Sequence, residues 1–170
     1  MELLDWTERA NLEHFGYGVK SFTLSMIETA AAILAEAVPS TLVREIVGLG
    51  KDLLSRPVDL IDGVAEVVEE LARSHRLLLI TKGDLLHQER KIHESGLAPF
   101  FEELEIVSEK DEDTYRRVLQ QHGVAAESFV MVGNSVKSDV LPVLAIGGRA
   151  VHIPYEYLWQ HEHAEHAGDV

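Results

Sequence analysis

Residues Phe129–Val140 read FVMVGNSVKSDV, and this stretch places polar side chains directly after a run of apolar ones. The run Phe129–Val132 has the length and apolar character of a buried strand. A turn at Gly133 follows, and the residues after it offer oxygen atoms: Asn134, Ser135, Ser138 and Asp139. The stretch therefore predicts a strand whose carboxyl end holds several oxygen ligands out into a loop.

Short apolar runs alternate with helical patterns from about residue 57 onward. The other predicted strands are LLLIT (Leu77–Thr81), LEIV (Leu104–Val107) and AVHI (Ala150–Ile153). Helices are predicted between them, over about Leu85–Ser95, around Tyr115–Leu119 and up to about Ala145. Strands that alternate with helices need crossover connections, and these produce a mostly parallel sheet. The predicted fold class is α/β, with a doubly wound, Rossmann-like sheet.

The residues before this region have a helical pattern instead. Apolar side chains between Phe22 and Val38 recur at helical spacing, namely Leu24, Ile27, Ala31 and Leu34, and others fill the opposite side. This helix is therefore expected to be covered on much of its surface. Pro39 ends it, and a second helix is predicted from Ser40. We expect residues 1–56 to form a helical cap, or a remnant of one, and residues 57–170 to form the α/β core.

The composition fits a compact folded chain without disulfides. The sequence has 170 residues, of which 46% are apolar, with a net charge of −14 and no cysteine. Nucleic acids and anionic membranes bind basic surfaces, so neither is an expected partner. The first residues lack an apolar signal core, and no 18-residue window is free of charge, so the expected location is the cytoplasm. The histidines of the tail, His161, His163 and His166, are not expected to form a dedicated metal site.

Candidate functional residues stand at the ends of three predicted strands. The first strand gives Thr81, Lys82 and Gly83, the second is soon followed by Lys110, and the third gives Asn134 and Asp139. Ligands of open parallel sheets bind beyond the carboxyl ends of the strands. A hydroxyl group, loop amides and a lysine suit a phosphate, and amide and carboxylate oxygens suit Mg²⁺. Together these residues predict a phosphoryl-transfer pocket.

Each of these residues also has a purely structural interpretation. Thr81 can be an ordinary turn residue. Lys110 lies in the run EKDEDT, where a surface lysine would pair with the neighbouring acids. Asp139 can help to cap a helix, and Asp84 is interpreted as the N-cap of the helix that follows it.

Three segments resemble motifs of the haloacid dehalogenase (HAD) superfamily. LLLITKGD, IVSEKDEDTY and MVGNSVKSDVLPVLAIGG resemble its second, third and fourth motifs, in a phosphatase-like branch. The resemblance covers about Asp62 to Tyr155, and the helices before it resemble the inserted helical cap of the family. It implies that Thr81 and Lys110 are catalytic, binding the phosphoryl group and steadying its charge, and that Lys82 and Gly83 border the substrate. Asn134 and Asp139 would hold Mg²⁺, directly or through water.

Two departures from the family pattern change the expectation. Asn134 stands where many members have an aspartate, so Mg²⁺ would bind weakly or not at all. The family's nucleophile is an aspartate of a D-x-D motif, on a strand that precedes the cap and lies at the centre of the sheet. No such strand and motif precede the helices here, and Asp5 is a poor candidate because neither a strand nor a second acid accompanies it.

Two functional hypotheses follow from the resemblance. The first is a Mg²⁺-dependent phosphomonoester hydrolase, with a small phosphorylated substrate or inorganic phosphate as its binding partner and with this chain truncated and inactive. The second is a degenerate, non-catalytic domain that binds an anion or a partner. A receiver-like signalling domain is a weaker third hypothesis, since no strand-end aspartate precedes Thr81. If the central strand position is vacant, we expect one of three outcomes. The two neighbouring strands pair directly with each other, a strand from another copy fills the position and produces a homodimer, or the chain is unstable.

Overall fold

The computed structural model describes residues 2–35 and 37–155, and the chain divides into two compact units, Met1–Ser108 and Glu109–Val170. Both units contain helices and a pair of parallel strands, which confirms the predicted α/β class. The predicted boundary between residues 56 and 57 lies inside the first unit, and the division into a cap and a core stays a prediction. Within the described ranges, no helix is both long and apolar enough to span a bilayer.

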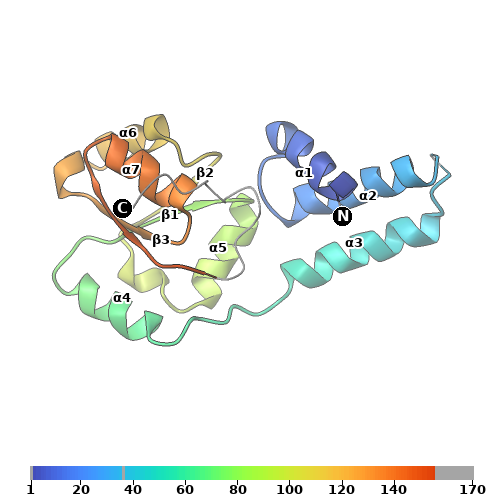
Figure 1. Ribbon diagram of the computed structural model, residues 1–170. Coiled ribbons are helices and arrows are strands. Elements are labelled where there is room, and N and C mark those ends of the chain that lie inside the picture. The colour runs from blue at the N-terminus through green and yellow to red at the C-terminus, as the bar shows by residue number, and fades with distance from the viewer. Residues whose placement is uncertain (1, 36, 156–170) are drawn as a thin grey trace. The chain divides into compact units, whose positions relative to one another are not determined.

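The first unit begins with three helices. These are α1 (Glu2–Phe15), α2 (Val19–Ile33) and α3 (Ser40–Leu54), drawn in blue to cyan in Figure 1. The predicted helix over residues 22–38 ends earlier than expected, and Ala35, just beyond α2, has a left-handed φ of 50°. Helix α3 approaches α2 closely at Gly50, where an added Cβ would overlap Thr23 Oγ1. The absence of a side chain at Gly50 therefore permits this packing.

The buried face of α2 is polar, which corrects the expectation drawn from its apolar residues. Its buried residues are spaced four apart: Ser21, Ser25 and Thr29. By contrast, the side chain of Leu24 is 44% exposed. Asn11 of α1 donates from Nδ2 to Ser25 Oγ at 3.0 Å and to Glu28 Oε2 at 2.8 Å. Small side chains and hydrogen bonds join the two helices here, a polar contact that the apolar spacing did not predict.

The first unit continues with α4 (Val64–Ala72), β1 (Leu78–Lys82), α5 (Leu85–Glu94) and β2 (Glu103–Val107). The strands β1 and β2 are parallel, in a register that runs from Leu78 opposite Glu103 to Lys82 opposite Val107. Ile80 and Val107 are buried in this unit. Because the strands are parallel, their carboxyl ends lie at one edge of the pair.

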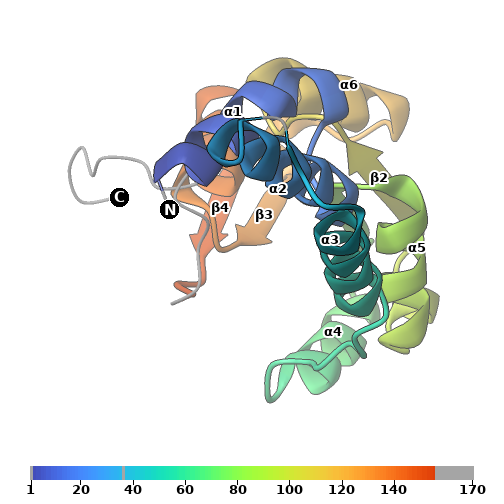
Figure 2. The same cartoon turned by 90° about the vertical axis from the view of Figure 1, so that its right-hand side faces the viewer.

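The second unit contains α6 (Glu112–Gln121), β3 (Val130–Gly133), a π-helical turn (Val136–Val140), α7 (Leu141–Ala145) and β4 (Arg149–His152). The parallel strands β3 and β4 lie side by side, with Gly133 opposite His152 (Figure 2). The apolar core of the unit is formed by Tyr115, Val118, Leu119, Met131, Val140 and Val143. The Tyr115 hydroxyl donates to the Ser138 carbonyl oxygen at 2.9 Å, so α6 holds the turn that follows β3.

Strand β3 is less buried than its apolar sequence predicted. Met131 is buried, but Val130 and Val132 are 42% and 49% exposed, because successive side chains of a strand point to opposite faces. Within the described part of the chain, β1 pairs with β2 and β3 pairs with β4, in two two-stranded sheets. The three outcomes expected for a vacant central position, including the homodimer formed by strand exchange, stay predictions.

Candidate functional site

The candidate residues of the first unit follow one another at the carboxyl end of β1. Thr81 and Lys82 are the last two residues of the strand, and Gly83 has a φ of 135° that only glycine adopts readily. The Gln88 side chain, on α5, donates from Nε2 to the Lys82 carbonyl oxygen at 2.7 Å. A Cβ on Gly83 would lie 2.6 Å from the same Nε2 atom, so glycine is needed for this contact.

Asp84 closes this loop as the N-cap of α5, as the sequence predicted. Its Oδ1 atom accepts a hydrogen bond from the His87 amide at 3.1 Å. Its Oδ2 atom accepts one from Lys20 Nζ, near the start of α2, at 2.7 Å. The hydrogen bond from Lys20 lowers the pKa of Asp84 below its usual value, and the His87 amide acts in the same direction. Asp84 is therefore a carboxylate at neutral pH.

A second contact joins the same two segments. The Lys82 ammonium lies 4.0 Å from the centroid of the Tyr17 ring. No motif in the sequence marks Tyr17 or Lys20 as a functional residue. The one available signal was the presence of two glycines in Gly16–Gly18. Both adopt positive φ angles, of 67° and 131°.

In the second unit, the π-helical turn folds Asp139 back onto the end of β3. Asp139 Oδ2 accepts a hydrogen bond from the Ser135 amide at 3.0 Å, and Ser135 Oγ accepts one from the Ser138 amide at 3.0 Å. The Asp139 side chain also lies where a Cβ of Gly133 would be. Glycine at the end of the strand is therefore required for Asp139 to occupy this place.

Lys110 and Asp139 form a buried ion pair. Lys110 Nζ lies 2.7 Å from Asp139 Oδ1, and the two side chains are 12% and 5% exposed. Lys110 is thus not a surface lysine paired with its neighbours. Those neighbours have other roles, since Asp111 accepts from the Thr114 amide as the N-cap of α6, and Glu112 and Asp113 pair with Arg116.

Asn134 lies exposed just beyond β3, and its carbonyl oxygen is 3.2 Å from His152 Nε2. Both carboxylate oxygens of Asp139 already accept hydrogen bonds, from Lys110 and from Ser135. Among the described residues, no group of three or more His, Cys, Asp or Glu side chains is placed to hold a metal ion. The tail histidines, His161, His163 and His166, lie outside the described residues.

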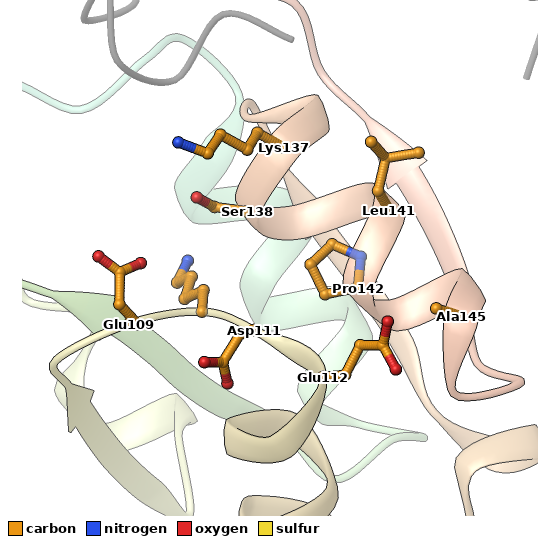
Figure 3. A pocket seen from close by; sticks show the side chains of 9 residues that line it. Glu109, Asp111, Glu112, Lys137, Ser138, Leu141, Pro142 and Ala145 are labelled. Carbon is orange, nitrogen blue, oxygen red and sulfur yellow. The ribbon is translucent and has the colours of Figure 1, made fainter. Parts of the chain in front are cut away.

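A hollow of about 500 Å³ lies beside Lys110. Two segments line it, residues 109–112 before and at the start of α6, and the stretch from Lys137 to Ala145. Figure 3 shows Lys137 and Ser138 on one side and the carboxylates of Glu109 and Asp111 on the other. Lys110, whose ammonium pairs with Asp139, is therefore one of the residues that border this hollow.

The comparisons with known proteins identify the family. A model of haloacid dehalogenase-like hydrolases matches residues 3–147. The chain belongs to this family. A solved haloacid dehalogenase-like family hydrolase from Xanthomonas campestris is 49% identical to it, with a TM-score of 0.87. That match covers 92% of this chain and 67% of the other.

More distant HAD structures share the fold. A 2-haloacid dehalogenase from Pseudomonas syringae is 18% identical with a TM-score of 0.60, over 94% of this chain and 72% of its own. A HAD hydrolase from Bacillus subtilis, bound to magnesium, is 18% identical with a TM-score of 0.64, over 88% of this chain and 68% of its own. No curated protein matches the chain.

The D-x-D motif of the HAD superfamily has no counterpart at a strand end in the part of the chain that the structure describes. Asp111 and Asp113 do have D-x-D spacing, which the sequence interpretation overlooked. However, Asp111 caps α6, and the Asp113 side chain is 95% exposed and pairs with Arg116. Asp5 lies within α1 and does not follow a strand.

Proposed function

We propose that the residues at the ends of β1 and β3 serve the hydrolysis of a small phosphomonoester with Mg²⁺. The observation that carries the proposal is the buried ion pair of Lys110 and Asp139 beside an open hollow. Asp139 accepts a hydrogen bond from one N–H group of the Lys110 ammonium, and an ammonium has three such donors. The remaining donors can bind phosphate oxygens as the charge of the phosphoryl group changes.

The loop after β1 supplies the complementary phosphate contacts in this proposal. The Thr81 hydroxyl is 3.4 Å from the Lys82 carbonyl oxygen, a weak hydrogen bond that a phosphate oxygen can replace. The amide of Gly83 offers a further donor in a loop with positive φ. Thr81 and Lys110 are the proposed catalytic residues, and Lys82 and Gly83 are the proposed substrate-binding residues.

Asn134 and Asp139 are the proposed ligands of Mg²⁺, and they fit this role only in part. Oxygen ligands suit the ion, but the pair offers one carboxylate whose two oxygens are already hydrogen-bonded. Bound Mg²⁺ would offset the negative charge of the phosphoryl group. Asp139 also orients Lys110, and this second role does not need the ion.

In this proposal the described residues bind and orient a phosphate, and none of their aspartates follows a strand as a D-x-D nucleophile does. We therefore propose that the chain by itself does not turn over substrate. The lack of a strand-end D-x-D within residues 2–35 and 37–155 equally favours the second candidate function, a non-catalytic domain that binds an anion.

Inorganic phosphate binding tests the phosphate site directly. Thr81→Val keeps the shape of the side chain and removes its hydroxyl, so we expect it to weaken binding by about ten-fold or more, because the lost hydrogen bond is to a charged group. Thr41→Val, at an exposed position of α3, is the matched control and should bind as the unmodified chain does. Calorimetric titration measures both. Equal affinity for the Thr81 variant and the control would contradict the proposal.

Magnesium affinity is expected to be weak and limited by the charge of the ligands. Asn134→Asp adds a carboxylate at the exposed end of β3, so we expect it to tighten Mg²⁺ binding by about ten-fold. Gln120→Glu adds the same charge on an exposed position of α6 and should leave the affinity unchanged. Calorimetry with MgCl₂ compares them. If both variants raised the Mg²⁺ affinity equally, the added negative charge would act non-specifically, and Asn134 would not be part of a Mg²⁺ site.

A further inference from the structure

The chain between α1 and α2 lies directly against the loop that follows β1. Gly18 has a φ of 131°, and a Cβ added to it would lie 3.2 Å from the Asp84 amide nitrogen. Any other residue at this position would be strained in its backbone and crowded against Asp84. The close approach of these two backbones is thus a specific feature of the sequence.

Tyr17 of this segment and Lys20 in the first turn of α2 contact the residues on either side of Gly83. The Tyr17 ring lies against the Lys82 ammonium, and Lys20 pairs with Asp84. Gln88 holds the Lys82 carbonyl group from the side of α5. The backbone around Gly83 is therefore fixed by contacts from α5 and from a segment 64 positions earlier in the sequence.

The charge of Asp84 makes the contact with Lys20 relevant to anion binding. Its carboxylate stands three positions after Thr81 and is ionised at neutral pH. An unpaired carboxylate there would repel a phosphate bound at Thr81 and Gly83. The ammonium of Lys20, 2.7 Å from Oδ2, offsets that charge, while Oδ1 remains bonded to the His87 amide.

We propose that Lys20 and Tyr17 are positioning residues for the anion-binding loop Thr81–Gly83, with Lys20 neutralising Asp84 and Tyr17 fixing Lys82. This proposal rests on the proposed phosphate site. It assigns a role in substrate binding to Tyr17 and Lys20 through their contacts with the residues around this loop.

A double-mutant cycle separates this charge effect from a loss of structure. Lys20→Met should weaken inorganic phosphate binding by about two- to five-fold, because the pair is partly exposed, and Lys20→Arg should restore it. Asp84→Asn keeps a good N-cap residue and removes the charge. In that background Lys20→Met should have almost no effect. Lys51→Met, at an exposed position of α3, is the matched control.

Two results in this cycle would overturn the proposal. One is unchanged phosphate affinity in Lys20→Met, and the other is an equal loss of affinity with and without the Asp84 carboxylate. Tyr17→Leu gives an independent reading, with an expected loss of about two- to five-fold since a cation–π contact is removed. Unchanged affinity in Tyr17→Leu would overturn the role of that ring.

Hydrogen exchange measured without phosphate tests the positioning role of Lys20 independently of the proposed phosphate site. Lys20→Met should speed the exchange of the His87 amide, which bonds to Asp84, and Lys20→Arg should return it to the original rate. If the unmodified chain does not bind phosphate, the proposed function fails, and this exchange alone decides whether Lys20 positions the loop. Unchanged exchange in Lys20→Met would refute that positioning.

Discussion

Replacing Asp139 with alanine is expected to lower the free energy of unfolding by about 3–5 kcal/mol. The change would leave the Lys110 ammonium, whose side chain is 12% exposed, without its partner. It would also leave the Ser135 amide without its acceptor and open a space above Gly133. The expected loss is a large fraction of the stability of a typical domain, which is about 5–15 kcal/mol.

Urea unfolding of matched variants can assign this loss to the ion pair. Asp113→Ala removes an aspartate whose side chain is 95% exposed, and it should cost less than about 1 kcal/mol. The double replacement Lys110→Met with Asp139→Leu removes both charges, and it should be less damaging than Asp139→Ala alone. A loss for Asp139→Ala no larger than that for Asp113→Ala would contradict a buried pair.

Local sequence patterns were sufficient to predict the order of helices and strands. The run Leu77–Thr81 and the stretch after Phe129 are short, apolar and followed by glycine, so β1, β3 and their polar ends were recognisable. Asp84 was also predicted as an N-cap, because capping depends on residues that are near in sequence. Ligands of parallel sheets bind beyond the carboxyl ends of the strands, and on this basis Thr81 and Asp139 were predicted as site residues.

Contacts between distant segments were not predictable in this way. The pairing of Lys20 with Asp84 depends on how the chain packs, and neither residue carries a sign of it in its own neighbourhood. The polar face of α2 around Ser25 was missed because hydrophobic spacing cannot show that Asn11 supplies a hydrogen-bonding partner. Burial of Lys110 was likewise hidden by the acids next to it in the sequence.

The second large effect concerns catalysis. The chain is expected to hydrolyse phosphomonoesters no faster than buffer with Mg²⁺, although we propose that it binds phosphate. Loss of the nucleophile of a covalent mechanism lowers kcat by a factor on the order of 10⁶. In the proposed site, Thr81 and Lys110 orient the phosphate but cannot form the covalent intermediate. Binding and turnover are thus predicted to separate in this chain.

The rate of aryl phosphate hydrolysis by the purified 170-residue chain tests this separation most directly. 4-Nitrophenyl phosphate and MgCl₂ are incubated with the unmodified chain and with Thr81→Val, each after repeated purification. The expected result is the same background rate for both proteins, together with phosphate binding that Thr81→Val weakens. Turnover that persists through repurification and disappears in Thr81→Val would show that these residues include a working nucleophile, and would contradict the account.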